Sequence, residues 1–223
     1  MTVTIPKHCE HVEALLRKLD EHLVVLNTIA LTELNVDGKL FGMDLLAWAA
    51  CKRIHNASGA LKLMVRSWNF LASAVLLRTH LDTALRFYAA WLVDNPNKFA
   101  DDFLAGKEIG KMKDRNNQQM RDGYLRDRLA EKYPWVTEVY TQTSSFIHFS
   151  DSHVFACFTE GHEDGHFSLR ISEFDFDLPE ERWTALVECF LKITKIFHLY
   201  LNGYAEAKRM TPAELAAGPS DHE

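Results

Sequence analysis

The stretch FLASAVLLRTHLDTALRFYAAWLV, residues 70–93, decides the fold that we expect for this chain. Its apolar residues recur at steps of three and four, which indicates an α-helix. When residues are projected at about 100° each, one face holds Phe70, Ala74, Leu77, Leu81, Ala84, Tyr88 and Trp91, and further apolar groups, Leu71, Val75 and Ala89, lie off that face. A helix with apolar groups on several sides is contacted from several sides, so we expect it at the centre of a helical bundle.

Further helices are predicted on both sides of this central segment. An amphipathic helix follows Pro6 and ends at the turn NVDGK, residues 35–39, and a second helix has Asp44 as its N-cap and runs toward Arg66. Asn95 and Pro96 begin a short helix, another covers about 136–149, and a long one follows Pro179 to about residue 209. The pattern is typical of a mainly α protein.

The apolar period changes before the last helix. The segments HVFACFTE and HFSLRISEFDF alternate as strands do and are separated by the turn residues GHEDG, which predicts one β-hairpin over about 153–176. Residues 106–123 are polar and locally basic, as in a mobile loop or a frayed helix, and the tail 211–223 is rich in Pro, Gly and Ala, as in a flexible segment. We therefore expect a single-domain helical bundle over residues 1–210 with the hairpin inserted before its C-terminal helix.

Composition excludes several classes of protein. The 223 residues are 47% hydrophobic and 25% charged, with a net charge of −6, so no global basic field favours nucleic acid or anionic membranes. The four cysteines are scattered, as in a reduced intracellular protein, and no signal peptide is evident. Charged residues interrupt the most apolar segment, 70–93, which argues against a membrane span. We expect a soluble, cytoplasmic protein.

Two groups of polar residues are candidates for chemistry. Arg78, Asp82 and Arg86 are spaced four apart on the central helix, so they can form a ladder of two ion pairs. If the ladder faces solvent, its ion pairs contribute little and have no functional meaning. If it is partly buried, the cost of burying the charges indicates a functional site. In SSFIHFS, residues 144–150, a polar stripe ends at His148. This histidine either acts as an acid, a base or a ligand, or it is a structural residue whose imidazole interacts with the backbone and the dipole at a helix C-terminus.

No metal or cofactor is predicted. The segments HFSDSH, residues 148–153, and GHEDGH, residues 161–166, each offer two imidazoles and one or more carboxylates, but neither matches a spacing with known ligand geometry. The segment GKEIGK, residues 106–111, lacks the spacing of a phosphate-binding loop, and no G-x-S-x-G motif is present.

The combination of LLRTHLDTALRFYAAWL, residues 76–92, with YTQTSSFIHFS, residues 140–150, resembles a family of mainly helical prokaryotic proteins, a domain of unknown function. In that family an Arg and an acidic residue four positions later on an apolar helix precede a Tyr…Ser-x-x-His segment. The resemblance spans about residues 60–155. It implies that Arg78, Asp82, Tyr140, Ser145 and His148 converge in one pocket.

An all-helical bundle with a candidate Arg and His also resembles, more distantly, the HEPN superfamily, whose ribonuclease members use Arg-x(4 to 6)-His on a late helix. This sequence departs from that pattern, because its early match, Arg17 to His22, lies on the first helix. Arg78 and His148 would have to meet through the fold instead.

Two functions follow as hypotheses, and they leave open whether the protein is an enzyme. In the first, a pocket of Arg78, Asp82, Ser145 and His148, with Tyr140 and Arg86 as ligand-binding residues, holds a small anionic ligand or a protein partner, as in a stress or defence accessory. The alternative is a HEPN-like, metal-independent hydrolase of RNA or nucleotides with His148 as acid or base and Arg78 stabilising phosphate charge. The acidic net charge disfavours RNA as a partner, and the long apolar helices favour a homodimer.

Overall fold

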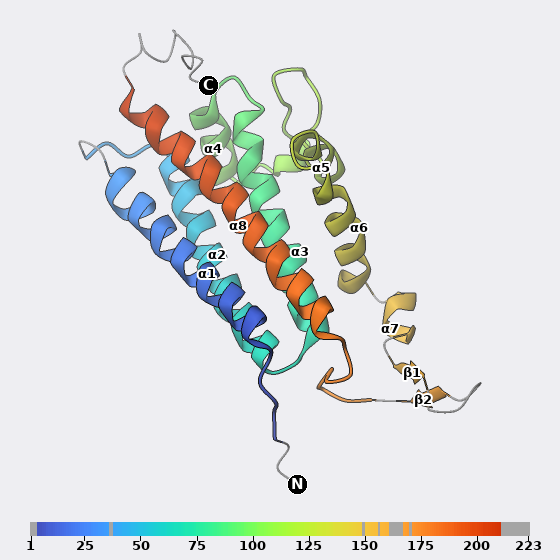
Figure 1. The fold of residues 1–223 in the computed structure, drawn as a ribbon. Coiled ribbons are helices and arrows are strands. Elements are labelled where there is room, and N and C mark those ends of the chain that lie inside the picture. The colour runs from blue at the N-terminus through green and yellow to red at the C-terminus, as the bar shows by residue number, and fades with distance from the viewer. Residues whose placement is uncertain are drawn as a thin grey trace.

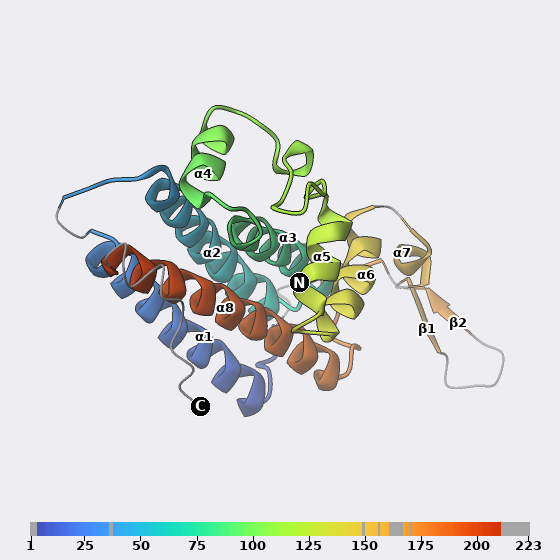
Figure 2. The same ribbon diagram turned by 90° about the horizontal axis from the view of Figure 1, so that it is seen from above.

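Helices form most of the chain in the computed structural model, which describes residues 4–35, 38–148, 150–155, 157–160, 167–169 and 171–210. The long helices run side by side (Figures 1 and 2). The α-helices are α1 (Glu10–Thr28), α2 (Gly42–Arg66), α3 (Phe70–Tyr88), α4 (Pro96–Leu104), α5 (Asp122–Ala130), α6 (Trp135–Ile147), α7 (Asp151–Phe155) and α8 (Glu180–Arg209). Short helical turns cover Ile29–Glu33, Ala89–Trp91 and Ile109–Lys111. The predicted mainly helical bundle is confirmed.

Helix α3 lies at the centre of the bundle. It packs against α2 and α8, and on its other side against α5 and α6. Residues on several faces of α3 are buried accordingly, including Leu77, His80, Leu81 and Leu85. Helix α8 also packs along α1, so the first, third and last long helices share one hydrophobic core.

Local capping explains where two of the predicted helices begin. The Asn69 side chain accepts a hydrogen bond from the Ala72 N–H at 2.9 Å at the start of α3, and Asn95 does the same for Lys98, also at 2.9 Å, at the start of α4. Asp44 is not the N-cap of α2 as predicted. Phe41 holds that position, and the Asp44 carboxylate one turn later accepts the Phe41 N–H at 2.7 Å.

The segment between α4 and α5 is not helical, apart from the turn Ile109–Lys111. Its turn is organised by the buried carboxylate of Asp114, which accepts the N–H groups of Asn116 and Gln118 at 2.9 and 2.8 Å and the hydroxyl of Tyr124. Met112 and Met120 anchor the segment in the core. The segment leads directly into Asp122, the first residue of α5.

The predicted β-hairpin over 153–176 is not confirmed. Its first residues belong to α7, and the strands β1 (Phe158–Glu160) and β2 (Phe167–Leu169) share only three antiparallel pairs. Two strands of this length bury too little apolar surface to be stable by themselves. The intervening residues 161–166 and the predicted tail 211–223 lie outside the described residues.

The chain returns to the bundle at the beginning of α3. Asp175 accepts the Phe70 N–H at 2.8 Å through its carboxylate, and its own N–H donates to the Trp68 carbonyl at 2.8 Å. The first bond satisfies a backbone N–H of the first turn of α3 that has no partner within the helix. Together the two bonds hold the segment that leads into α8 against the start of α3.

Candidate functional site

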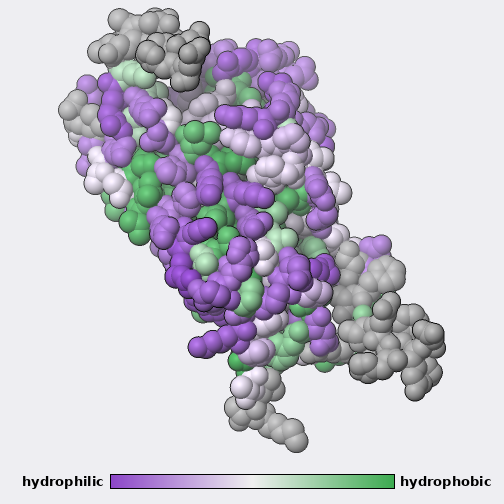
Figure 3. Space-filling view, in the orientation of Figure 1, coloured by the Kyte–Doolittle hydropathy of each residue, from purple (hydrophilic) through white to green (hydrophobic). Residues whose placement is uncertain are grey.

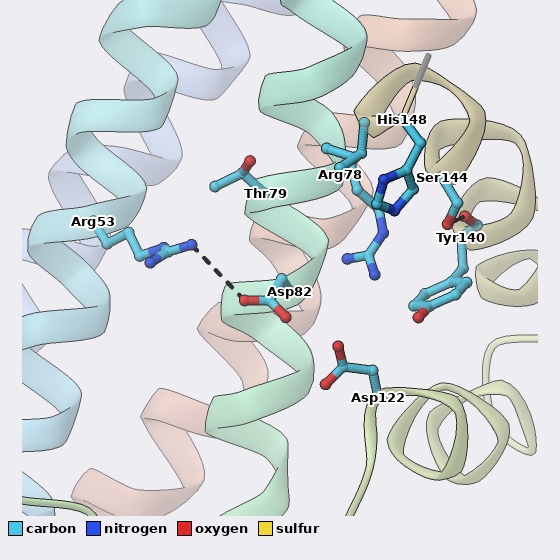
Figure 4. A pocket seen from close by; sticks show the side chains of 9 residues that line it. Arg53, Arg78, Thr79, Asp82, Asp122, Tyr140, Ser144 and His148 are labelled. Atoms are coloured by element: carbon cyan, nitrogen blue, oxygen red, sulfur yellow. Dashed lines mark hydrogen bonds and ion pairs between the residues drawn. The ribbon is translucent and has the colours of Figure 1, made fainter. Parts of the chain in front are cut away.

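An open pocket of about 350 Å³ lies between α2, α3, α5 and the end of α6 (Figure 4). Residues from these four segments line it: Arg53, Arg78, Thr79, Asp82, Asp122, Tyr140, Ser144, Ile147 and His148. The structure thus brings together four of the residues predicted for the site, namely Arg78, Asp82, Tyr140 and His148.

Two carboxylates of the pocket are joined by one guanidinium. Arg86 donates from Nε to both oxygens of Asp82, at 3.0 and 3.1 Å, and from Nη2 to Oδ1 of Asp122 at 2.8 Å. Arg53 on α2 approaches Asp82 from across the pocket, with 3.8 Å between Nη2 and Oδ2 (Figure 4). Arg86, which was predicted to bind ligand, is not among the residues that line the pocket and instead pairs with the two carboxylates from behind them.

Arg78 does not form the ion pair with Asp82 that its spacing predicted. Its guanidinium carbon lies 4.1 Å from the centroid of the Tyr140 ring, and Arg126 lies 5.2 Å from the same centroid. An acidic residue four positions before a basic one is the favourable order on a helix, which explains why Asp82 pairs with Arg86 rather than with Arg78. Within the described part of the chain, the Arg78 guanidinium has no hydrogen bond or ion pair.

Ser144, rather than the predicted Ser145, lines the pocket. Ser144 follows Tyr140 by one helical turn and so shares its face, and its hydroxyl donates to the Tyr140 carbonyl at 2.6 Å. Ser145 is rotated by about 100° from that face, and its hydroxyl donates to the Gln142 carbonyl at 2.7 Å. The structure therefore does not bring Ser145 into the lining of the pocket.

His148 follows the last residue of α6 in an extended conformation, and it is exposed at the rim of the pocket. The alternative in which backbone groups of the helix end satisfy its imidazole is not what the structure shows, since the ring has no hydrogen-bond partner among the described residues. His148 and Arg78 both line the pocket (Figure 4).

The charges in and behind the pocket do not cancel. Three guanidinium groups, Arg53, Arg78 and Arg86, face two carboxylates, Asp82 and Asp122. The excess is one positive charge with His148 neutral. Since Arg86 and Arg53 are engaged with the carboxylates, the excess charge lies at Arg78.

Sequence reasoning missed Arg53, Thr79 and Asp122, and from the polar stripe it chose Ser145 for the site instead of Ser144. Arg53 and Asp122 come from segments far from residues 70–93 and 140–150 along the chain, and no spacing rule connects them to Arg78. Ser144 could have been found from its helical spacing to Tyr140.

Across the described residues, no group of three or more His, Cys, Asp and Glu side chains is arranged to hold a metal ion. In the same part of the chain, no helix combines the length and the apolar character needed to cross a bilayer. No family model, no curated protein and no solved structure matches the chain. The function must therefore be argued from the geometry of the pocket itself.

Proposed function

We propose that the protein binds a small anionic ligand in the pocket between α2, α3, α5 and α6, with Arg78 as the principal anchor. One observation carries the proposal: the Arg78 guanidinium lies over the Tyr140 ring and has no acidic partner among the described residues, in a pocket with an excess of positive charge. Binding of a phosphate or carboxylate group would supply that missing partner.

The contact with Tyr140 suits this role. Stacking on an aromatic face holds a guanidinium in place but leaves its N–H groups free to donate in the plane of the group. Arginine can then bind a phosphate or carboxylate through two parallel hydrogen bonds, which are stronger than neutral ones. A pocket of about 350 Å³ lies at the lower end of the range for small-molecule sites.

A second candidate function is hydrolysis of a phosphoester bond, and the observation that favours it is the presence of His148 and Arg78 in one pocket. In this proposal His148 would act as acid or base, and Arg78 would stabilise the charge that develops on phosphate oxygens. Asp82, which pairs with Arg86, would hold the neighbouring arginine side chains in position. This is the function that the distant resemblance to HEPN ribonucleases implies.

Other properties expected from the sequence also stay predictions. They are the cytoplasmic location, the homodimer, a protein partner at the pocket, and a hairpin insertion in the region of α7, β1 and β2. The apolar side chains exposed in that region, among them Leu169 and Ile171, are compatible with a docking role.

Titration of inorganic phosphate into the protein, followed by calorimetry, tests the binding function. We expect Arg78→Gln to lose phosphate affinity by roughly tenfold or more, because charge-assisted hydrogen bonds are lost. Arg17→Gln is the matched control, since Arg17 is an exposed arginine of α1 outside the pocket. The thermal unfolding midpoint should barely change in either variant.

Equal phosphate affinity in wild type and Arg78→Gln, or no binding by wild type, would contradict the proposal. The same protein is then incubated with a nucleoside monophosphate and with a short single-stranded RNA, and products are followed by phosphorus NMR and electrophoresis. Turnover that is lost in His148→Ala while phosphate still binds supports the hydrolase, and absence of turnover in wild type rejects it.

A further inference from the structure

The pocket has an acidic side as well as a basic one. The Asp122 side chain is 39% exposed, and only its Oδ1 is engaged, by Arg86, among the described residues. Asp82 on α3 likewise keeps acceptor capacity, because a carboxylate can accept about four hydrogen bonds and Asp82 receives two, both from Arg86 Nε. Figure 4 shows the Asp122 carboxylate directed toward Arg78 and the centre of the pocket.

A simple anion would use Arg78 but would gain nothing from this acidic side. A ligand that fills the pocket must present hydrogen-bond donors to Asp122 and Asp82, since an unmatched carboxylate loses water without compensation. The ligand therefore carries an anionic group at one end and donors at the other.

The donors are better supplied by hydroxyl groups than by an amine. Arg86 already pairs with both carboxylates, and Arg53 approaches Asp82, so a ligand ammonium would add a further positive charge to a pocket that has one in excess. Hydroxyl groups donate to carboxylates without adding charge. Paired hydroxyls on an acidic side chain are also a common mode of ribose recognition.

We infer that the ligand is a polyhydroxylated phosphate ester, in the class of sugar phosphates, with its phosphate on Arg78 and its hydroxyls on Asp122 and Asp82. This inference rests on the proposed binding function. Thr79, between Arg78 and Asp82 on α3, donates its hydroxyl to the Val75 carbonyl at 2.9 Å and so offers an acceptor to the same ligand.

The experiment compares four probes by calorimetry: inorganic phosphate, propyl phosphate, ribose 5-phosphate and phosphoethanolamine. Propyl phosphate carries the anionic group without hydroxyls, and phosphoethanolamine carries an amine instead. We expect wild type to bind ribose 5-phosphate roughly tenfold more tightly than propyl phosphate, as one hydrogen bond to a charged group predicts.

Substitution of Asp122 then distinguishes the contribution of the acidic side of the pocket to ligand binding from that of the basic side. In Asp122→Ala the preference for ribose 5-phosphate over propyl phosphate should fall severalfold, whereas propyl phosphate itself should bind as well or better, because a negative charge has been removed. Asp102→Ala is the matched control, since Asp102 is a carboxylate of α4 outside the pocket.

Each outcome decides one claim. Equal affinity for the two esters, an unchanged preference in Asp122→Ala, or tighter binding of phosphoethanolamine than of ribose 5-phosphate would overturn the sugar phosphate inference. In all three cases, binding of inorganic phosphate that depends on Arg78 would leave the proposed function standing. Failure of every probe to bind would overturn both.

Discussion

His80 shows how the core of α3 treats a titratable side chain that is not part of the pocket. It is fully buried, its ring stacks on Phe190 with 3.9 Å between centroids, and its Nε2 lies 2.9 Å from the Thr194 hydroxyl oxygen. Because the Thr194 hydroxyl donates to the Phe190 carbonyl, it accepts from the His80 Nε2–H, which leaves Nδ1 without a proton or partner in the described structure. Burial lowers the pKa of His80 to about 3.

This pKa predicts a loss of stability in acid. The unfolded chain binds a proton at His80 below a pH of about 6.5, and the folded protein does not until a pH of about 3. The free energy of unfolding should therefore fall by about 1.4 kcal/mol per pH unit through this window from His80 alone. Urea denaturation of wild type and His80→Gln at pH 7, 6 and 5 measures it, since all other groups titrate in both proteins.

Between pH 7 and pH 5 wild type should lose roughly 2 kcal/mol more than His80→Gln. Parallel pH profiles for the two proteins would mean that His80 is solvated or protonated in the folded state, against the burial described above.

Single residues of the pocket could be predicted from sequence only where they share a helix or a motif. Arg78 and Asp82 were found because their spacing places them on one side of α3, and Tyr140 and His148 because they occur in one short segment. The partner of each charge could not be predicted. Asp82 had candidate arginines on its own helix and in α2, and only the packing of α2 and α5 on α3 decides which of them approach it.

At the scale of helices, a buried ion pair joins the end of α8 to the start of α2. Lys208 donates to Asp44 Oδ2 at 2.7 Å, and the two side chains are 5% and 0% exposed. The Tyr204 hydroxyl donates to Asp44 Oδ1 at 2.8 Å, and Lys208 also donates to the carbonyls of Leu34 and Lys39. The pair thus joins three segments of the chain, and both carboxylate oxygens of Asp44 have hydrogen-bond donors.

Removing one partner would leave an uncompensated buried charge. We expect Lys208→Met to lower the free energy of unfolding by about 3–5 kcal/mol in chemical denaturation. Lys192→Met is the control, because Lys192 is an exposed residue of the same helix, and it should change stability by less than about 0.5 kcal/mol.

The double variant Asp44→Asn, Lys208→Met distinguishes a charge effect from loss of packing. It should be more stable than the sum of the two single losses predicts, because no charge is left unpaired. Strictly additive losses would contradict an ion pair at this position.

The helices themselves were largely predictable, because apolar period and caps are local properties. The middle of each long helix follows from its spacing, and the starts of α3 and α4 follow from Asn69 and Asn95. The start of α2 was wrong by a few residues, since Asp44 can serve helix α2 either as its N-cap or from the first turn. The hairpin expected from residue 153 onward is not supported over its first residues, which belong to α7, because short apolar runs do not distinguish strand from helix.

At the scale of the whole molecule, several large apolar side chains are exposed along α1 and the turn that follows it. Figure 3 shows a largely hydrophilic face with an apolar patch over the upper half of α1. The exposed apolar residues here are Val24 and Val25 on α1 and Leu31 in the following turn. Val24 and Leu31 are 65% and 70% exposed. Contiguous exposed apolar side chains on a helix are typical of a surface that meets another protein.

We expect this surface to be the contact of the homodimer, because a patch on one helix can pair with its own copy across a twofold axis. Light scattering after size-exclusion chromatography should give twice the chain mass of 25.6 kDa. Val24→Glu with Leu31→Glu should give the single-chain mass, since it places like charges opposite each other in the interface. The control is Leu104→Glu, which changes an exposed residue of α4 and should leave the dimer intact.

A single-chain mass for wild type over the micromolar range would contradict the dimer. A double variant that is still dimeric would place the contact on another face.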